Sequence, residues 1–181
     1  MMLLKCYLEL NEVDKAESSL NRLVESFPDD MNVLLASYTI LKKTTQDPNK
    51  LYDRSLELLD SVLNRKDLKN LDRIGYMVID NAEKIVNSEN VTEITKQVCR
   101  ILEASEDKDI AKRVYGYFQK LQSNNIIGNQ EMLNFLRKYE TKIEVDKNLI
   151  DSLEEDNIKQ QESLMSKLNS EGRLHSLFIK K

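Results

Sequence analysis

Apolar residues recur every three or four positions along nearly the whole chain, a spacing that places them on one face of an α-helix. Residues 13–27 show the pattern plainly, with Val13, Ala16, Leu20 and Leu23 on one face. Polar stretches separate such segments, and residues 43–50 (KTTQDPNK) are expected to form a loop. The alternation predicts an all-α protein whose helices are joined by short turns.

The periodic segments predict helices over the approximate ranges 3–10, 13–27, 30–41, 51–63, 68–85, 91–102, 107–121, 132–143 and 149–168. Asn90, followed three residues later by Glu93, fits a capping box, so we expect the Asn90 side chain to cap the sixth helix. Cys6 and Cys99 lie on the apolar side of their segments. Both thiols are therefore expected to be buried and unpaired, as in an intracellular protein of the cytoplasm or nucleus.

The composition agrees with helices and disfavours sandwiches and barrels, which need many turn residues. The 181 residues include only 4 Gly and 2 Pro, while 40% are hydrophobic and 32% are charged. The net charge of −4 argues against a generic nucleic-acid binder, because such proteins carry an excess of Lys and Arg. No apolar run approaches the roughly 18–20 residues of a membrane span, so we expect none.

The spacing of a few residues in segment 3–28 has a physical reason. A small residue at Ala16 lets two helices of a hairpin approach closely, and Tyr7 and Leu20 fill the space beside that contact. Asn11 lies in the turn, where a residue that tolerates the left-handed conformation is favoured. Pro28 cannot continue a helix, so it ends the second one.

These positions, together with Leu3 and Leu23, resemble the tetratricopeptide repeat, a 34-residue helix-turn-helix unit. Leu4 departs from the family pattern, which prefers a small residue there. A weaker resemblance extends over residues 29–65. It rests on Leu35-Ala36 in one helix and on the small and large residues of the next, Ser55, Leu59 and Val62.

The resemblance implies stacked antiparallel helical hairpins, that is, a tetratricopeptide-like α-α superhelix, ending in a long C-terminal helix. We expect the solenoid to occupy residues 1–145. Residues 146–181 form a helical tail that binds a partner or caps the solenoid. The tail ends in an apolar cluster in which the expected partner contacts are Leu174, Leu177 and Phe178.

No catalytic, cofactor or metal site is expected. His175 is the only histidine, and no candidate ligands lie close to it in the sequence. Motifs such as HExxH, GxSxG, CxxC and glycine-rich phosphate loops are absent from the sequence. We therefore expect a non-enzyme with no small-molecule substrate and no cofactor.

The expected function is a protein-interaction or scaffold module that binds a peptide or helix of another protein. The family's geometry places first helices along a concave surface, where Asn32, Tyr38 and Lys42 are candidates to face the partner.

The alternative is a piece of a larger tetratricopeptide scaffold, for example of a transport, chromatin or meiotic chromosome assembly, and the Asn-, Lys- and Ile-rich composition suggests a eukaryotic source. In this register Met1 falls inside a first helix. We therefore expect either a longer solenoid or a first helix covered by the tail or by another protein.

Overall fold

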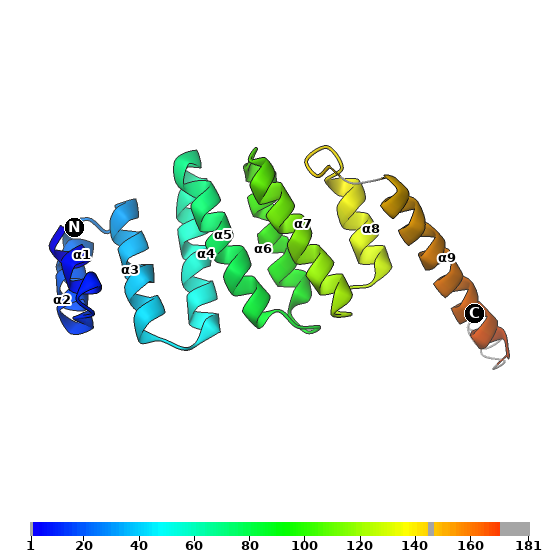
Figure 1. Ribbon diagram of the computed structural model, residues 1–181, viewed down its shortest axis with the longest axis horizontal. Helices are drawn as coiled ribbons and strands as arrows, with labels where there is room; N and C mark the ends of the chain where they lie inside the picture. The colour runs from blue at the N-terminus through cyan, green and yellow to red at the C-terminus, as the bar shows by residue number, and fades with distance from the viewer. Residues whose placement is uncertain (1, 145–146, 171–181) are drawn as a thin grey trace, which may run out of the picture. The chain divides into compact units, whose positions relative to one another are not determined.

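A computed structural model of the chain describes residues 2–144 and 147–170, and in this part every regular element is an α-helix. The all-α fold class is therefore confirmed. The helices within the described ranges are α1 (Met2–Glu9), α2 (Val13–Ser26), α3 (Met31–Thr44), α4 (Pro48–Arg65), α5 (Leu68–Ile85), α6 (Val91–Ala104), α7 (Lys108–Ser123), α8 (Asn129–Lys138) and α9 (Lys147–Ser170) (Figure 1).

Packing divides the chain into two compact units, Met1–Val114 and Tyr115–Lys181. The division lies within α7, whereas the sequence suggested a boundary at residue 145. Helices α8 and α9 pack on each other, and both belong to the second unit. The two units are described separately below.

The α1–α2 hairpin of the first unit follows the spacing of its residues. Asn11 has a φ of 57°, the left-handed conformation expected at the turn. Ala16 is fully buried, and Pro28 lies directly after the end of α2 and its C-cap residue, Phe27. Leu4, the departure from the repeat pattern, is only 1% exposed. A large residue is accommodated there because it enters the core.

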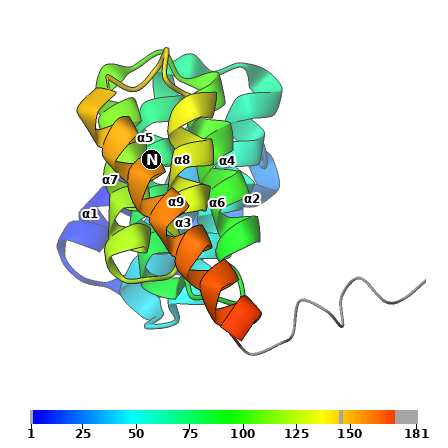
Figure 2. The same cartoon turned by 90° about the vertical axis from the view of Figure 1, so that its right-hand side faces the viewer.

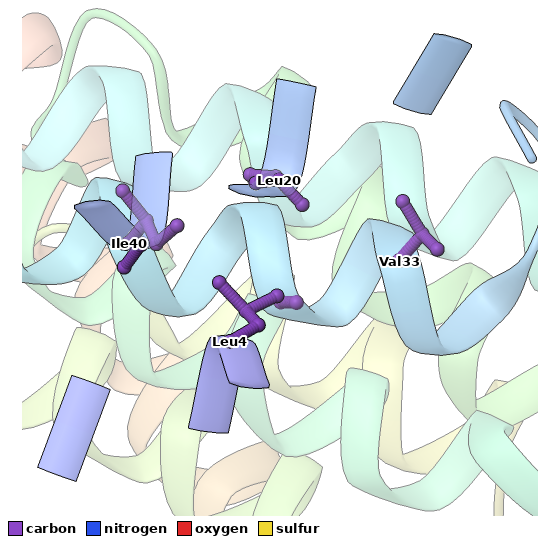
Figure 3. Packing of buried hydrophobic residues seen from close by; sticks show 6 residues of the cluster. Leu4, Leu20, Val33 and Ile40 are labelled. Atoms are coloured by element: carbon purple, nitrogen blue, oxygen red, sulfur yellow. The ribbon is translucent and has the colours of Figure 1, made fainter. Parts of the chain in front are cut away.

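This core joins the first three helices. Leu4 of α1, Leu20 of α2 and Val33 and Ile40 of α3 gather with Ala16 and Ala36 in one buried cluster (Figure 3). Four half-buried residues pack against this cluster, namely Tyr7, Leu8, Val13 and Leu23. Fully burying each large aliphatic side chain stabilises a fold by roughly 1.5–3 kcal/mol, so this contact holds the three helices together.

Ion pairs connect helices that are two apart in the sequence. Arg100 of α6 lies 2.7 Å from Asp60 of α4. Arg113 of α7 lies 2.6 Å from Asp80 of α5. Figure 2 accordingly shows α1 and α5 on one side of the unit and α2, α4 and α6 on the other. Each of these exposed pairs contributes about 0.2–1 kcal/mol to the packing of alternate helices.

In the second unit, aromatic stacking and polar contacts set the packing. The rings of Phe118 and Phe135 stack with centroids 3.7 Å apart, which joins the second half of α7 to α8. Arg137 of α8 pairs with Glu154 of α9 at 2.5 Å, and the Asn157 amide donates to the Gln130 amide oxygen at 2.6 Å. Of these two pairs, the one with the later residue of α8 (Arg137) has the earlier residue of α9 (Glu154). The two helices therefore run antiparallel.

Two local predictions were wrong. The loop at residues 43–50 is much shorter, because α3 continues to Thr44 and α4 already begins at Pro48. Proline suits the first turn of a helix, where its missing N–H is not needed, and the Asp47 carboxylate accepts from the Asn49 amide. The Asn90 side chain makes no capping bond to α6. It accepts from the backbone of Asn87 and donates to the carbonyl of Ile85, so it closes the preceding turn.

The prediction of two buried thiols was also wrong, since Cys6 is exposed and Cys99 is half-buried. Cys6 is two residues from Leu4 and two from Leu8, about 200° around the helix, so it faces away from the side of α1 that packs. Cys99 lies about 100° from Val98, at the edge of the buried stripe of α6.

We expect Gly75→Ala to lower the free energy of unfolding by about 1–2 kcal/mol, even though alanine is the better helix former. A Cβ at this position would lie 2.7 Å from Ile101 Cγ2 and 3.3 Å from Ile110 Cδ1, both in buried side chains. Gly116→Ala is the matched control, because a Cβ there meets nothing within 4 Å. Thermal and urea unfolding should show Gly116→Ala unchanged or stabilised by up to about 1 kcal/mol. Equal effects of the two changes would contradict the close approach at Gly75.

Candidate functional site

A groove with a volume of about 300 Å³ lies in the first unit, where α1, α3 and α5 meet. Its lining residues are Leu4, Leu8, Asn32, Leu35, Ala36, Thr39 and Arg73. Aliphatic side chains form most of the floor, and Asn32, Thr39 and Arg73 supply the polar atoms. The groove can therefore hold an apolar group while hydrogen-bonding to its polar neighbours.

The helical repeat explains how α3 contributes four residues. Asn32, Leu35, Ala36 and Thr39 are spaced by three or four positions, so they lie on one face. The Asp30 carboxylate fixes the start of this face, because it accepts from the backbone amides of Asn32 at 2.8 Å and Val33 at 3.2 Å. At the other end of α3, the Lys43 ammonium donates to the Leu8 carbonyl at 2.6 Å. The Lys43 contact therefore ties the last turn of α3 to α1, the helix that carries Leu4 and Leu8 to the groove.

The structure places the partner-contact residues predicted from the sequence in different environments. Asn32 is exposed and lines the groove. Lys42 is exposed but is not among the lining residues. Leu174, Leu177 and Phe178 lie outside the described residues.

Tyr38 is a correction, because it is only 8% exposed and belongs to the core. Its hydroxyl accepts a hydrogen bond of 2.8 Å from the side-chain amide of Asn81 on α5. The same amide donates to the Leu51 carbonyl of α4 at 3.3 Å. Tyr38 and Asn81 thus join three helices and are not available to a partner.

Arg73 is the lining residue that sequence reasoning missed. It lies on α5 between the buried residues Leu71 and Ile74, and is itself exposed. Periodicity marks it only as a polar-face residue, like many other basic residues of the chain. Its role depends on the packing of α5 beside α3, which no local pattern reports.

The residues that line this groove include few side chains that could act in catalysis. The one hydroxyl among the lining residues is that of Thr39, and it donates to the Leu35 carbonyl at 2.9 Å. Among the residues that the structure describes, no group of three or more His, Cys, Asp or Glu side chains is placed to hold a metal ion.

A second surface lies on α9 in the other unit. Leu153, in the first half of α9, is buried at 8% exposed, whereas Ile158, Leu164 and Met165 are each more than half exposed. A hollow of about 410 Å³ lies beside the last two of these. The remaining residues that line it are Asn157, Gln160 and Gln161. This half of α9 therefore presents apolar side chains that no described residue covers.

Comparisons with protein-family models, curated proteins and solved structures found no match to this chain. Within residues 2–144 and 147–170, no helix combines the length and the apolar character needed to cross a membrane.

We expect Tyr38→Phe to lower the free energy of unfolding by about 1 kcal/mol, because the Asn81 amide loses a buried acceptor. Tyr52→Phe is the matched control. Tyr52 is 6% exposed, and its hydroxyl is buried without a hydrogen-bond partner. Burial raises the pKa of Tyr52 to about 12, which agrees with a hydroxyl that has lost water and gained no bond. Urea unfolding should therefore show Tyr52→Phe unchanged or stabilised, and the reverse order of the two variants would contradict these assignments.

Proposed function

We propose that this protein is a non-catalytic interaction module that binds a peptide or helix of another protein in the groove of α1, α3 and α5. The observation that carries the proposal is the apolar floor of this groove, formed by Leu4, Leu8, Leu35 and Ala36. Helix-in-groove recognition uses such a floor to take up the apolar side chains of an amphipathic segment. The groove volume of about 300 Å³ is at the low end for small-molecule pockets, which favours one or two side chains of a peptide over a whole ligand.

The proposal includes a tetratricopeptide-like architecture for the first unit. The left-handed Asn11, the buried Ala16 and the ion pairs between alternate helices support it. In such an architecture the first helices of successive hairpins line one surface. Here α1, α3 and α5 take that place, and together they line the groove.

A second candidate is a structural piece of a larger intracellular assembly. The observation in its favour is the exposed apolar half of α9, with Ile158, Leu164 and Met165. Exposed apolar side chains that lie together often mark a protein-interaction surface. In this case the groove and α9 would contact different members of one assembly.

Filling the groove should abolish peptide binding without unfolding the protein. We expect Thr39→Tyr to do so, because Thr39 is a half-buried lining residue. Thr44→Tyr is the control, since it makes the same change in an exposed residue of α3 outside the groove. Asn32→Tyr is a second groove-filling variant at an exposed position. The measurement is selection of displayed 12-residue random peptides on the full chain, with circular dichroism of each variant.

Peptides that are enriched on the wild type and on Thr44→Tyr, but not on the two groove-filling variants, would support the proposal. Enrichment that persists on folded Thr39→Tyr and Asn32→Tyr would place binding elsewhere and contradict it. So would failure of the wild type to enrich any peptide.

The second candidate has a separate test. We expect Leu164→Glu and Met165→Glu to reduce the mass of the complex that a tagged chain forms in its own cells, because a charge in an apolar interface is costly. Ser163→Glu places the same charge on another exposed position of α9. Light scattering of the affinity-purified complexes is the measurement. A complex of unchanged mass in both variants would rule out α9 as its contact surface.

A further inference from the structure

Arg73 differs from the other residues of the groove because it is the only charged one among those that line it. No described residue accepts a hydrogen bond from its guanidinium or pairs with it. A guanidinium carries five donors and a permanent positive charge, and it binds carboxylates in a bidentate manner. Arg73 therefore has binding capacity that the fold itself does not use.

The other arginines give this observation its weight. In the described part of the chain, most arginines already bind a carboxylate, in the pairs Arg54–Glu57, Arg65–Asp29, Arg100–Asp60, Arg113–Asp80 and Arg137–Glu154. Arg22 of α2 is the other described arginine without such a partner, and it is not among the lining residues. The unpaired state of Arg73 is thus unusual for this protein and coincides with the groove.

Arg73 gives the lining of the groove a positive charge that no lining carboxylate offsets. Asp and Glu are absent from the residues that line it. The nearby carboxylate of Asp30 already accepts two backbone amides at the start of α3. Lys42, on the same helix, is exposed and makes no ion pair with a described residue. An anionic group in the groove would therefore meet Arg73, with no carboxylate among the lining residues to repel it.

We infer that the occupant of this groove is a segment of another protein in which an Asp or Glu side chain lies close to a large apolar residue. The apolar side chain packs on the exposed part of the floor, chiefly the half-buried Leu8, and the carboxylate binds Arg73. The Asn32 amide, at the same groove, offers a further donor. This inference rests on the proposed function and adds the chemistry of the partner.

The test uses the selection on the full chain with three proteins: wild type, Arg73→Glu, and Arg22→Glu as the matched control. One library displays peptides between two flanking domains, so that no chain end is free, and a second library displays free C-termini. We expect the first library to enrich Asp or Glu near Leu, Ile, Met or Phe on the wild type and on Arg22→Glu. On Arg73→Glu, the acidic position should change to Lys or Arg, because the sign of the site is reversed.

The affinity of the most enriched peptide gives a second measurement, by fluorescence anisotropy. Arg73→Glu should weaken binding by at least about tenfold, and Glu→Lys in the peptide should restore most of the loss on that variant. Binding to the wild type should also weaken as NaCl rises, because the ion pair is partly exposed. Unchanged circular dichroism of Arg73→Glu is expected, since the side chain makes no contact that the fold needs.

The outcomes separate the inference from the proposed function. Enriched apolar peptides without an acidic position, or an acidic preference that survives in Arg73→Glu, would overturn the inference while the groove remains a peptide site. Enrichment only in the library of free C-termini would overturn it too, because the bound carboxylate would then belong to a chain end. If neither library yields peptides that depend on the groove, both the inference and the proposed function fail.

Discussion

The apolar contact among α1, α2 and α3 is the interaction on which the groove depends. Leu4 and Ala36 belong to the buried cluster of these helices and also line the groove. The floor of the candidate site is therefore the outer surface of a core, and its shape is fixed by packing before any partner arrives. Binding to such a preformed surface avoids much of the entropy cost of ordering side chains.

A buried polar contact fixes the position of α5, the third helix that lines the groove. The Asn81 amide bonds both the Tyr38 hydroxyl and the Leu51 carbonyl, so α3, α4 and α5 are held in one register. A buried amide must find its partners or lose the free energy of its lost hydration, which makes alternative registers costly. Arg73 is carried on α5, and this register determines which residues of α3 lie across the groove from it. The polar contact thus shapes the groove although neither Tyr38 nor Asn81 is among the residues that line it.

In the second unit, aromatic and aliphatic contacts hold the helices together. Stacked rings of Phe118 and Phe135 join α7 to α8, and Leu153 packs the first half of α9 into the unit. The rest of α9 extends the same helix with Leu164 and Met165 exposed. One helix therefore has a packed first half and a later half whose apolar side chains are not covered by any residue that the structure describes.

Local sequence rules determined the all-α class, most helix ranges, the turn at Asn11 and the burial of Ala16, since each depends on periodicity or on one residue's backbone preference. The capping of helix ends, and the burial of residues at the edges of the apolar faces, were less predictable. Asn90 had several acceptors and donors within reach, and Cys6 faced a side of α1 that only packing could cover or leave open. Tyr38 and Arg73 show the limit most clearly. Both are residues of amphipathic helices, and only the position of α5 beside α3 buried the tyrosine against Asn81 and placed the arginine at the groove. The sequence determined the helices and their apolar faces, while the tertiary structure decided which polar side chains meet, because contacts between distant segments follow from packing and not from local spacing.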